Sequence, residues 1–325
     1  MPFEATAVSE APPSRTTPPE PRVAILLCTF NGQNHLHEQL DSFTAQNHRN
    51  WQMWISDDGS QDDTLNILQH YQSTTEPDKI RLQAGPRQGF VANFMSLTCQ
   101  ADIEVDFYAY ADQDDIWEPD KLQRALTCLQ QVAPHTPALY CTRTRVVDKS
   151  GKHVGFSPLF RKPPSFANAL VQNVGGGNTM VFNRAARDLL REVSPGAHIV
   201  SQDWWMYMVV SGCGGRVYYD AYPSVRYRQH GDNLVGANSS WTARAVRMRM
   251  LWQGRFRNWT DLNLNSLEHL RHRLTRDNQI ILEHFSAARR ASGWRRLTDI
   301  LASGVYRQTT LGTLSLLLAA AFGKV

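Results

Sequence analysis

Short apolar runs alternate with amphipathic segments through the first part of the chain. Residues 22–29, 51–55 and 106–111 form hydrophobic runs of strand length, whereas apolar residues within 36–46 recur at helical spacing. Because strands and helices take turns in this way, the pattern predicts an α/β fold: a mostly parallel, doubly wound sheet flanked by helices.

Polar residues follow each of these strands, at 29–31, 57–58 and 112–115. Ligands of such sheets bind beyond the carboxyl ends of the strands, so we expect the three loops to converge on one edge. Ser60 and Asp63 predict a capping box at the start of the next helix. The region has neither a GxGxxG sequence nor a P-loop, which disfavours a dinucleotide site.

The pattern becomes mixed after residue 141. Residues 148–151 (DKSG) predict a hairpin turn. Three glycines at 175–177 precede an expected strand at 179–182, and Asn183 is the expected cap of a further helix.

Composition indicates one large domain with two unlike ends. The chain has 325 residues, 42% of them hydrophobic. Residues 1–21 are rich in Pro, Ser and Thr and are expected to be disordered. We expect a globular domain at 22–236, with halves at 22–116 and 117–236, and a basic helical extension at 237–325.

The positive charge of the basic extension indicates that this segment contacts an anionic surface such as a membrane. From residue 236 onward there are 14 Lys or Arg against 5 Asp or Glu. An ordinary solvated helical face is the alternative. Residues 311–322 are apolar but too short to span a bilayer and would lie in its interface. No signal peptide is evident, and the five cysteines lack C-x-x-C spacing, which favours a reducing cytoplasm.

Asp112, Asp114 and Asp115 place three carboxylates within four residues. Like charges repel, and an ordered turn tolerates them most easily when a cation lies among them. Carboxylate oxygens suit Mg²⁺ or Mn²⁺, which leave coordination positions open for phosphates. The alternative is a solvated acidic turn that caps the helix begun at Pro119.

Five segments, in this order, resemble family-2 glycosyltransferases of the GT-A fold: ILLCTFNG, WISDDGSQDDT, YADQDDIW, QDWW and YRQHGDNLVG. The resemblance covers residues 22–236. The third and fifth segments look most like bacterial rhamnosyltransferases, which build O-antigen and capsular polysaccharide. The resemblance implies an inverting, metal-dependent enzyme that takes a sugar from a nucleotide-diphospho-sugar donor.

The resemblance also implies donor-site roles. The first nucleotide-contacting loop would be Thr29, Phe30 and Asn31. Asp58 would accept a hydrogen bond from the N3–H of uracil or thymine, a donor that cytosine lacks. Arg228 would contact the diphosphate.

For the metal, the resemblance implies Mg²⁺ or Mn²⁺ held by Asp114 and Asp112. Asp112 would also face the ribose or the donor sugar. Asp115 would support the site or cap a helix. His230 would complete the metal or diphosphate site, and the alternative for it is a polar loop residue.

Asp203 matches the catalytic base of the family and is the only carboxylate at its position, because Gln202 stands where many relatives carry Glu or His. A helix N-cap is the alternative role of Asp203. Gly176 and Gly177 would let the backbone approach the sugar. Trp204 and Trp205 would stack on the acceptor, and core packing is the alternative.

The expected reaction is transfer of a sugar, most simply L-rhamnose from dTDP-rhamnose, to a glycan or lipid-linked acceptor. It would occur in the cytoplasm, with the protein peripheral at the inner face of the cell membrane and no nucleic acid involved. The alternatives are a UDP-hexose donor and a non-catalytic scaffold that binds nucleotide sugars.

Overall fold

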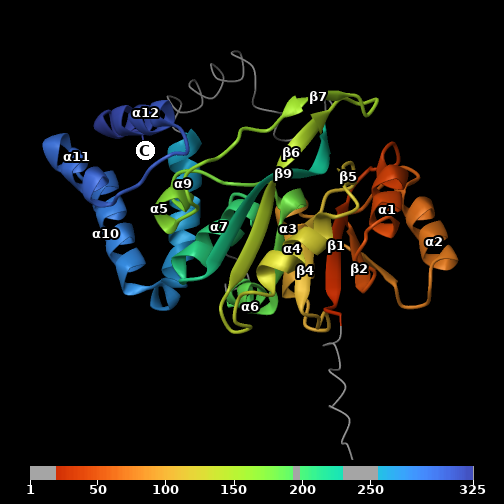
Figure 1. Cartoon of the computed structure of the whole chain (residues 1–325). Helices are drawn as coiled ribbons and strands as arrows, with labels where there is room; N and C mark the ends of the chain where they lie inside the picture. Colours follow the sequence, from red (N-terminus) through yellow and green to blue (C-terminus); the bar gives the residue numbers. More distant parts are fainter. Residues whose placement is uncertain (1–19, 193–197, 230–254, 325) are drawn as a thin grey trace, which may run out of the picture.

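One sheet organises the part of the chain that the computed structural model describes, residues 20–192, 198–229 and 255–324 (Figure 1). Within these residues the strand order is β3-β2-β1-β4-β8-β6-β9-β5, and β7 pairs with β6. The strands are β1 (Val23–Thr29), β2 (Trp51–Asp57), β3 (Ile80–Ala84), β4 (Phe107–Ala111), β5 (Ile116–Trp117), β6 (Ala138–Val147), β7 (His153–Phe156), β8 (Val181–Asn183) and β9 (Arg216–Arg228).

Helices follow the strands in the expected alternation. They are α1 (Leu36–Thr44), α2 (Thr64–Thr74), α3 (Phe90–Cys99), α4 (Lys121–Leu129), α5 (Phe166–Ala169), α6 (Arg184–Arg191), α7 (Gln202–Gly212), α9 (Arg255–Glu268), α10 (Arg276–Arg290), α11 (Gly293–Ala302) and α12 (Thr310–Ala321), with the short 3₁₀ turns η1 (Gly177–Thr179) and η2 (Arg271–Arg273).

The first half of the sheet is parallel. Strand β1 lies between β2 and β4 and runs parallel to both, and β2 is parallel to β3. Every residue of β1 is buried, because alternate side chains enter two different cores. Leu26 packs in the core that includes residues of α3 and α7, and Leu27 packs in the core that includes residues of α1 and α4. The predicted α/β fold is confirmed.

The second half of the sheet is mixed. Strand β8 pairs antiparallel with β4 and with β6, whereas β6 and β9 are parallel. Strands β6 and β7 form the expected hairpin, in which the Gly151 amide donates to the Asp148 carbonyl. Asn183 caps α6 as expected, since its side chain accepts a hydrogen bond from the Ala186 amide.

The expected capping box at Ser60 and Asp63 is wrong. Helix α2 begins at Thr64, and the side chain of Asp63 makes no cap hydrogen bond. The Ser60 hydroxyl instead donates to the Asp57 carboxylate and accepts from the Asn31 amide. Ser60 therefore serves the turn after β2 and not the helix.

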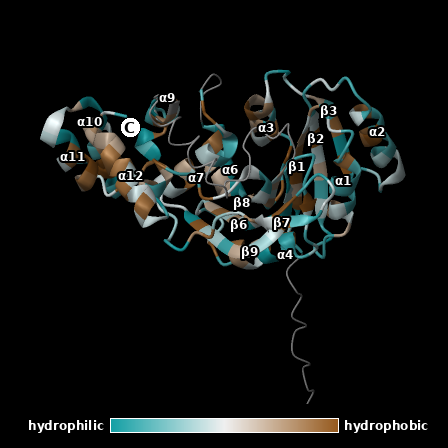
Figure 2. Ribbon diagram, turned by 90° about the horizontal axis from the view of Figure 1, so that it is seen from above, coloured by the Kyte–Doolittle hydropathy of each residue, from teal (hydrophilic) through white to brown (hydrophobic). Residues whose placement is uncertain are grey.

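The C-terminal helices share a core with the sheet. Leu267, Phe285, Ile300 and Leu316 belong to the same buried cluster as Leu26 of β1. Figure 2 shows the hydrophobic stretches of α10, α11 and α12 gathered together at one end of the molecule. Polar contacts add to this packing, for instance the Asn168 side-chain amide that donates to the Tyr306 carbonyl. The division at residues 236 and 237 stays a prediction.

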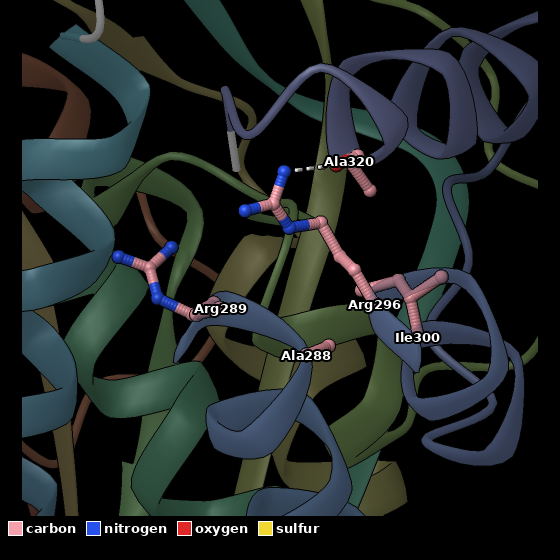
Figure 3. Close-up of a pocket in the computed structure, with 5 residues that line it drawn as sticks. All are labelled: Ala288, Arg289, Arg296, Ile300 and Ala320. Carbon is pink, nitrogen blue, oxygen red and sulfur yellow. Dashed lines mark hydrogen bonds between the residues drawn. The ribbon is translucent and has the colours of Figure 1, made fainter. Parts of the chain in front are cut away.

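Arg296 joins α11 to the end of α12 (Figure 3). Its guanidinium donates to the Ala320 carbonyl at 3.4 Å and to the Ala291 carbonyl at 2.9 Å. The last carbonyls of a helix lack partners within the helix and carry partial negative charge, so a cation there stabilises the helix. Between residues 20 and 324, leaving out 193–197 and 230–254, no helix combines the length and apolarity needed to cross a membrane.

Replacement of Phe285 by Ala tests whether the sheet and the C-terminal helices fold as one unit. Phe285 is fully buried in the shared core, and such a truncation typically costs about 3–5 kcal/mol. We expect denaturant unfolding to show one transition, shifted as a whole. The control Ile280→Ala, at a position 46% exposed on the same helix, should change stability little. A separate early transition in Phe285→Ala, with the sheet unaffected, would contradict the shared core.

Candidate active site

The polar ends of β1, β2 and β4 lie side by side because parallel pairing aligns them. Thr29 is in register with Asp57, and Leu27 with Ala111. The Thr29 hydroxyl donates to Asp57 Oδ1 at 2.8 Å. The expected convergence of the three loops is therefore present.

Asp58 is nearly buried and holds the loop that precedes α3. Its Oδ1 accepts from the Arg87 amide at 2.6 Å, and its Oδ2 from the Gly89 amide at 2.8 Å. Arg87 and Gly89 both have positive φ, so these bonds fix an unusual backbone path. Each carboxylate oxygen can accept a further hydrogen bond. The role of Asp58 toward a nucleotide base stays a prediction.

Gln113 clamps the first loop to the acidic loop. Its Oε1 accepts from the Phe30 amide at 2.8 Å, and its Nε2 donates to the Phe30 carbonyl at 2.9 Å. The Phe30 ring is left 55% exposed at this edge of the sheet. No sequence pattern pointed to Gln113. The only local sign of it is Gly32, where an added Cβ would lie 2.3 Å from Gln113 Oε1.

The acidic loop concentrates negative charge in a partly buried place: Asp115 is buried, and Asp112 and Asp114 are half-buried. Burial raises the pKa of Asp112 to about 7, and the neighbouring charges of Asp114 and Asp203 add to the rise. Burial, followed by the charges of Asp114 and Asp112, also raises the pKa of Asp115. The structure thus brings Asp203, 88 or more residues away along the chain, into electrostatic contact with the loop.

Oxygen donors of this kind fit the expected Mg²⁺ or Mn²⁺, which would relieve the crowding of charge. Asp112 and Asp114 are the two residues that could hold it. No group of three or more His, Cys, Asp or Glu side chains suited to a metal occurs within the described ranges. His230 lies outside the described residues. The metal ligands stay a prediction.

Asp115 has a structural environment unlike that of its neighbours. It is fully buried and accepts hydrogen bonds from the Asn178 side chain and, at 3.3 Å, from the Arg228 amide. The helix that follows begins after Asp120, so the helix-cap alternative for Asp115 is wrong. Lys121 provides a nearby positive charge; burial lowers its pKa to about 7, while the charge of Asp115 acts in the opposite direction.

The buried side chain of Arg228 supports the acidic loop through a hydrogen bond to its backbone. Its side chain is 1% exposed, and its guanidinium donates to the carbonyls of Asp114 and Lys149 and to the Glu38 carboxylate. The structure therefore does not present this guanidinium to an incoming diphosphate, the role that the resemblance implied. It uses the charge to tie together the loop, the β6–β7 hairpin and α1.

Asp203 is the second residue of α7, and Ser201 occupies the N-cap position. Its Oδ1 accepts from the Ser201 hydroxyl and the Trp204 amide, and its Oδ2 accepts from the Gly177 amide at 3.2 Å. Burial raises the pKa of Asp203, and these hydrogen bonds act in the opposite direction. The expected N-cap alternative is therefore wrong in detail, although Asp203 does lie in the first turn of the helix.

The glycine turn is close-packed against this helix. A Cβ added at Gly177 would lie 2.9 Å from Gln202 Nε2, and one at Gly176 would lie 2.7 Å from Asn178 Oδ1. These glycines thus permit the approach of α7 and of Asn178, and their role toward a sugar stays a prediction. Trp204 and Trp205 are 7% and 0% exposed and lie in the main core, which is the packing alternative.

Asp112→Asn tests the crowding of charge in metal-free protein. A carboxyl whose pKa rises from 3.8 to about 7 on folding stabilises the fold when protonated. That stability is lost as the pH rises toward and through 7. Asp112→Asn should therefore raise the free energy of unfolding more at pH 8 than at pH 5, by about 1 kcal/mol or more, which thermal unfolding at the two pH values measures. The exposed Asp78→Asn should give no such pH-dependent gain, and an equal gain for Asp112→Asn at both pH values would contradict the raised pKa.

Two known proteins are similar in sequence to this chain. The chain is 29% identical over 239 residues to the dTDP-rhamnosyl transferase RfbG of Shigella flexneri, which covers 69% of this chain and 78% of the relative. It is 31% identical over 113 residues to the GalNAc(5)-diNAcBac-PP-undecaprenol beta-1,3-glucosyltransferase of Campylobacter jejuni, about 35% of each chain.

Solved structures show the same fold. TarS of S. aureus, residues 1–349, superposes with a TM-score of 0.53 at 14% identity, covering 87% of this chain and 89% of that one. Its complex with UDP-GlcNAc gives a TM-score of 0.52. The two structures are of one protein, and the likeness shows a shared fold.

Residues 24–192 match the family described as Glycosyl transferase family 2. This match takes in β1, the loops after β1, β2 and β4, the acidic loop and the glycine turn. The chain belongs to glycosyl transferase family 2.

Proposed function

We propose that this enzyme transfers L-rhamnose from dTDP-rhamnose, with inversion, to a glycan or lipid-linked acceptor during synthesis of a bacterial surface polysaccharide. The observation that carries the proposal is the meeting of Asp203 with the acidic loop at one turn: the Gly177 amide donates to Asp203 Oδ2 at 3.2 Å, and the side chain of the neighbouring Asn178 donates to the Asp115 carboxylate. A base on one side of the transferred sugar and a diphosphate site on the other are what a single displacement requires.

The donor assignment rests on two supports. A relative that covers 69% of the chain is named a dTDP-rhamnosyl transferase. Asp58 lies beside the loop after β1 and suits the N3–H of thymine. Uracil offers the same donor, and TarS binds UDP-GlcNAc, so a UDP-hexose is the alternative donor.

Asp203 would take the proton of the acceptor hydroxyl as that oxygen attacks the anomeric carbon. Burial, which raises the pKa of Asp203, makes it a stronger base near neutral pH. The hydrogen bonds from Ser201 and Gly177 hold the carboxylate in one orientation. Asp112 and Asp114 would hold the divalent metal of the family, which when bound neutralises the leaving diphosphate.

A non-catalytic scaffold that binds nucleotide sugars is the rival function. It leaves unexplained why a half-buried carboxylate stands at the first turn of α7, where its partial burial carries an energetic cost. Measurable transfer to any acceptor would exclude it.

Asp203→Asn tests the base. The amide keeps the shape of the side chain but cannot accept a proton, so we expect kcat to fall about 10²- to 10⁴-fold. Transfer would be assayed with dTDP-rhamnose and UDP-glucose, with and without Mn²⁺. Calorimetric binding of the preferred donor should persist in the variant, and the remote Asp78→Asn should transfer normally. Near-full transfer by a folded Asp203→Asn protein would rule out this mechanism.

We also propose that the protein attaches to the anionic face of the membrane through α12. Leu311, Leu314, Leu318 and Phe322 are 71%, 53%, 64% and 65% exposed and share one side of the helix. Leu316, on the opposite side, is buried in the core. A contiguous exposed apolar row of this kind marks an interaction surface.

Charge favours an anionic lipid surface as the partner. Residues 255–324 carry 11 Lys or Arg against 5 Asp or Glu, and Lys324 lies two residues after the last residue of the apolar row. In Figure 1, α12 lies on the side of the molecule toward which β1 runs with its carboxyl end. A membrane bound there would face the same side as the loops of the candidate site, where a lipid-linked acceptor would be presented.

The double variant Leu314→Ser and Leu318→Ser tests this surface. Loss of two exposed leucines should reduce partition onto vesicles that contain phosphatidylglycerol at least about tenfold. Thermal stability and transfer to a water-soluble acceptor should stay unchanged. The control pair Leu65→Ser and Leu159→Ser removes exposed leucines elsewhere and should bind as before. Equal binding by both pairs, or equal binding to purely zwitterionic vesicles, would contradict the proposal.

A further inference from the structure

A hydrogen-bonded path connects the acidic loop to the base. The Asn178 side-chain amide donates to the Asp115 carboxylate, and the neighbouring Gly177 amide donates to Asp203 Oδ2 at 3.2 Å. Asp115 is 0% exposed and Asn178 is 3% exposed. Two loops that come from distant parts of the sequence are thus joined, away from water, by one side-chain contact.

Strand pairing brings the two loops together but does not fix them. Strands β4 and β8 are antiparallel, and their ladder pairs Ala109 with Val181. One further bond, from the Tyr110 amide to the Met180 carbonyl, extends the pairing toward the site. Beyond it, the acidic loop and η1 leave the sheet, and the contact between Asp115 and Asn178 is the side-chain link across that gap.

The chemistry of the pair is specific. A buried carboxyl oxygen requires hydrogen-bond donors, because a buried polar group without a partner is costly. Asn178 and the Arg228 amide supply these donors. The contact of Asn178 Oδ1 with the turn also requires glycine at 176, where an added Cβ would lie 2.7 Å away.

We propose that Asp115 and Asn178 are positioning residues whose hydrogen bond sets the placement of the acidic loop relative to Asp203. The inference rests on the proposed function and deepens it. Asp112 and Asp114 hold the donor side of the reaction, and Asp203 acts on the acceptor side. Asp115, third of the three carboxylates, therefore serves neither the metal nor proton transfer. It fixes the distance across which the sugar moves.

A reciprocal exchange separates this role from direct participation. Asn178→Asp replaces the amide donor by a second carboxyl group; assayed at alkaline pH, where both groups are ionised, the two repel each other and the link is lost. Because a small misplacement of reacting groups can cost about 10²-fold in rate, we expect kcat to fall by about that factor, with the KM for the donor changed less than about threefold. Adding Asp115→Asn restores one amide donor facing one carboxylate, and kcat should return to within about tenfold of the wild type.

If Asp115 were a metal ligand, or acted on the substrate, the exchanged protein would stay as inactive as Asn178→Asp, which would overturn the proposal. The matched control is Asn183→Ala, at the other end of β8. Asn183 is also buried and accepts hydrogen bonds from the Ala138 and Ala186 amides. Its loss should lower the unfolding midpoint and leave kcat unchanged.

Hydrogen exchange gives a readout that does not depend on transfer. Amides in 112–117 and 175–180 should exchange faster together in Asn178→Asp, recover in the exchanged protein, and stay protected in Asn183→Ala. A wild type without transfer to any acceptor would refute the proposed function alone. Failure of the exchanged protein to recover protection would refute the link itself.

Discussion

Crowded negative charge at the carboxyl end of β4 is the constraint around which the rest of the site is built. Asp112 and Asp114 are half-buried and Asp115 is fully buried in one loop, and Asp203 approaches this loop from α7. Each of these charges is costly to bury without compensation. The surrounding structure offsets part of that cost with hydrogen-bond donors to Asp115 and Asp203. These donors hold the two carboxylates in place, although the repulsion between the charges remains.

The groups that hold the backbone of this loop come from many elements. Gln39 donates to the Asp112 carbonyl, Gln113 grips the backbone of Phe30, and Arg228 reaches behind the loop to the Asp114 carbonyl. Lys121 lies beneath, with its ammonium 3.5 Å from the centre of the Trp117 ring. These contacts make the loop rigid before any substrate arrives, and a site that is preorganised in this way loses little free energy to rearrangement during the reaction.

The sheet, the polar loops at its edge and the acidic residues were predictable because they depend on local pattern and on the direction of parallel strands. Leu26 and Leu27 lie in buried runs that any reading of periodicity detects. Gln113 and Asn178 were not predictable, since their partners lie 83 and 63 residues away. The buried position of Arg228 was not predictable for a related reason. The sequence shows that an arginine ends a strand, but not that its guanidinium turns inward. The capping box predicted at Ser60 was wrong because serine and aspartate are common both in helix caps and in turns.

The shared core has a consequence for how the chain is made. Trp205, Phe285, Leu316 and Ala320 pack in one cluster, yet more than a hundred residues separate the first of them from the last. During synthesis the helix that carries Asp203 emerges long before α10 to α12 exist to cover it. A nascent chain that has reached residue 236 would expose the apolar surface of α7, the condition in which partly made chains aggregate or bind chaperones. The order of synthesis thus leaves the base among the last parts of the site to become fixed.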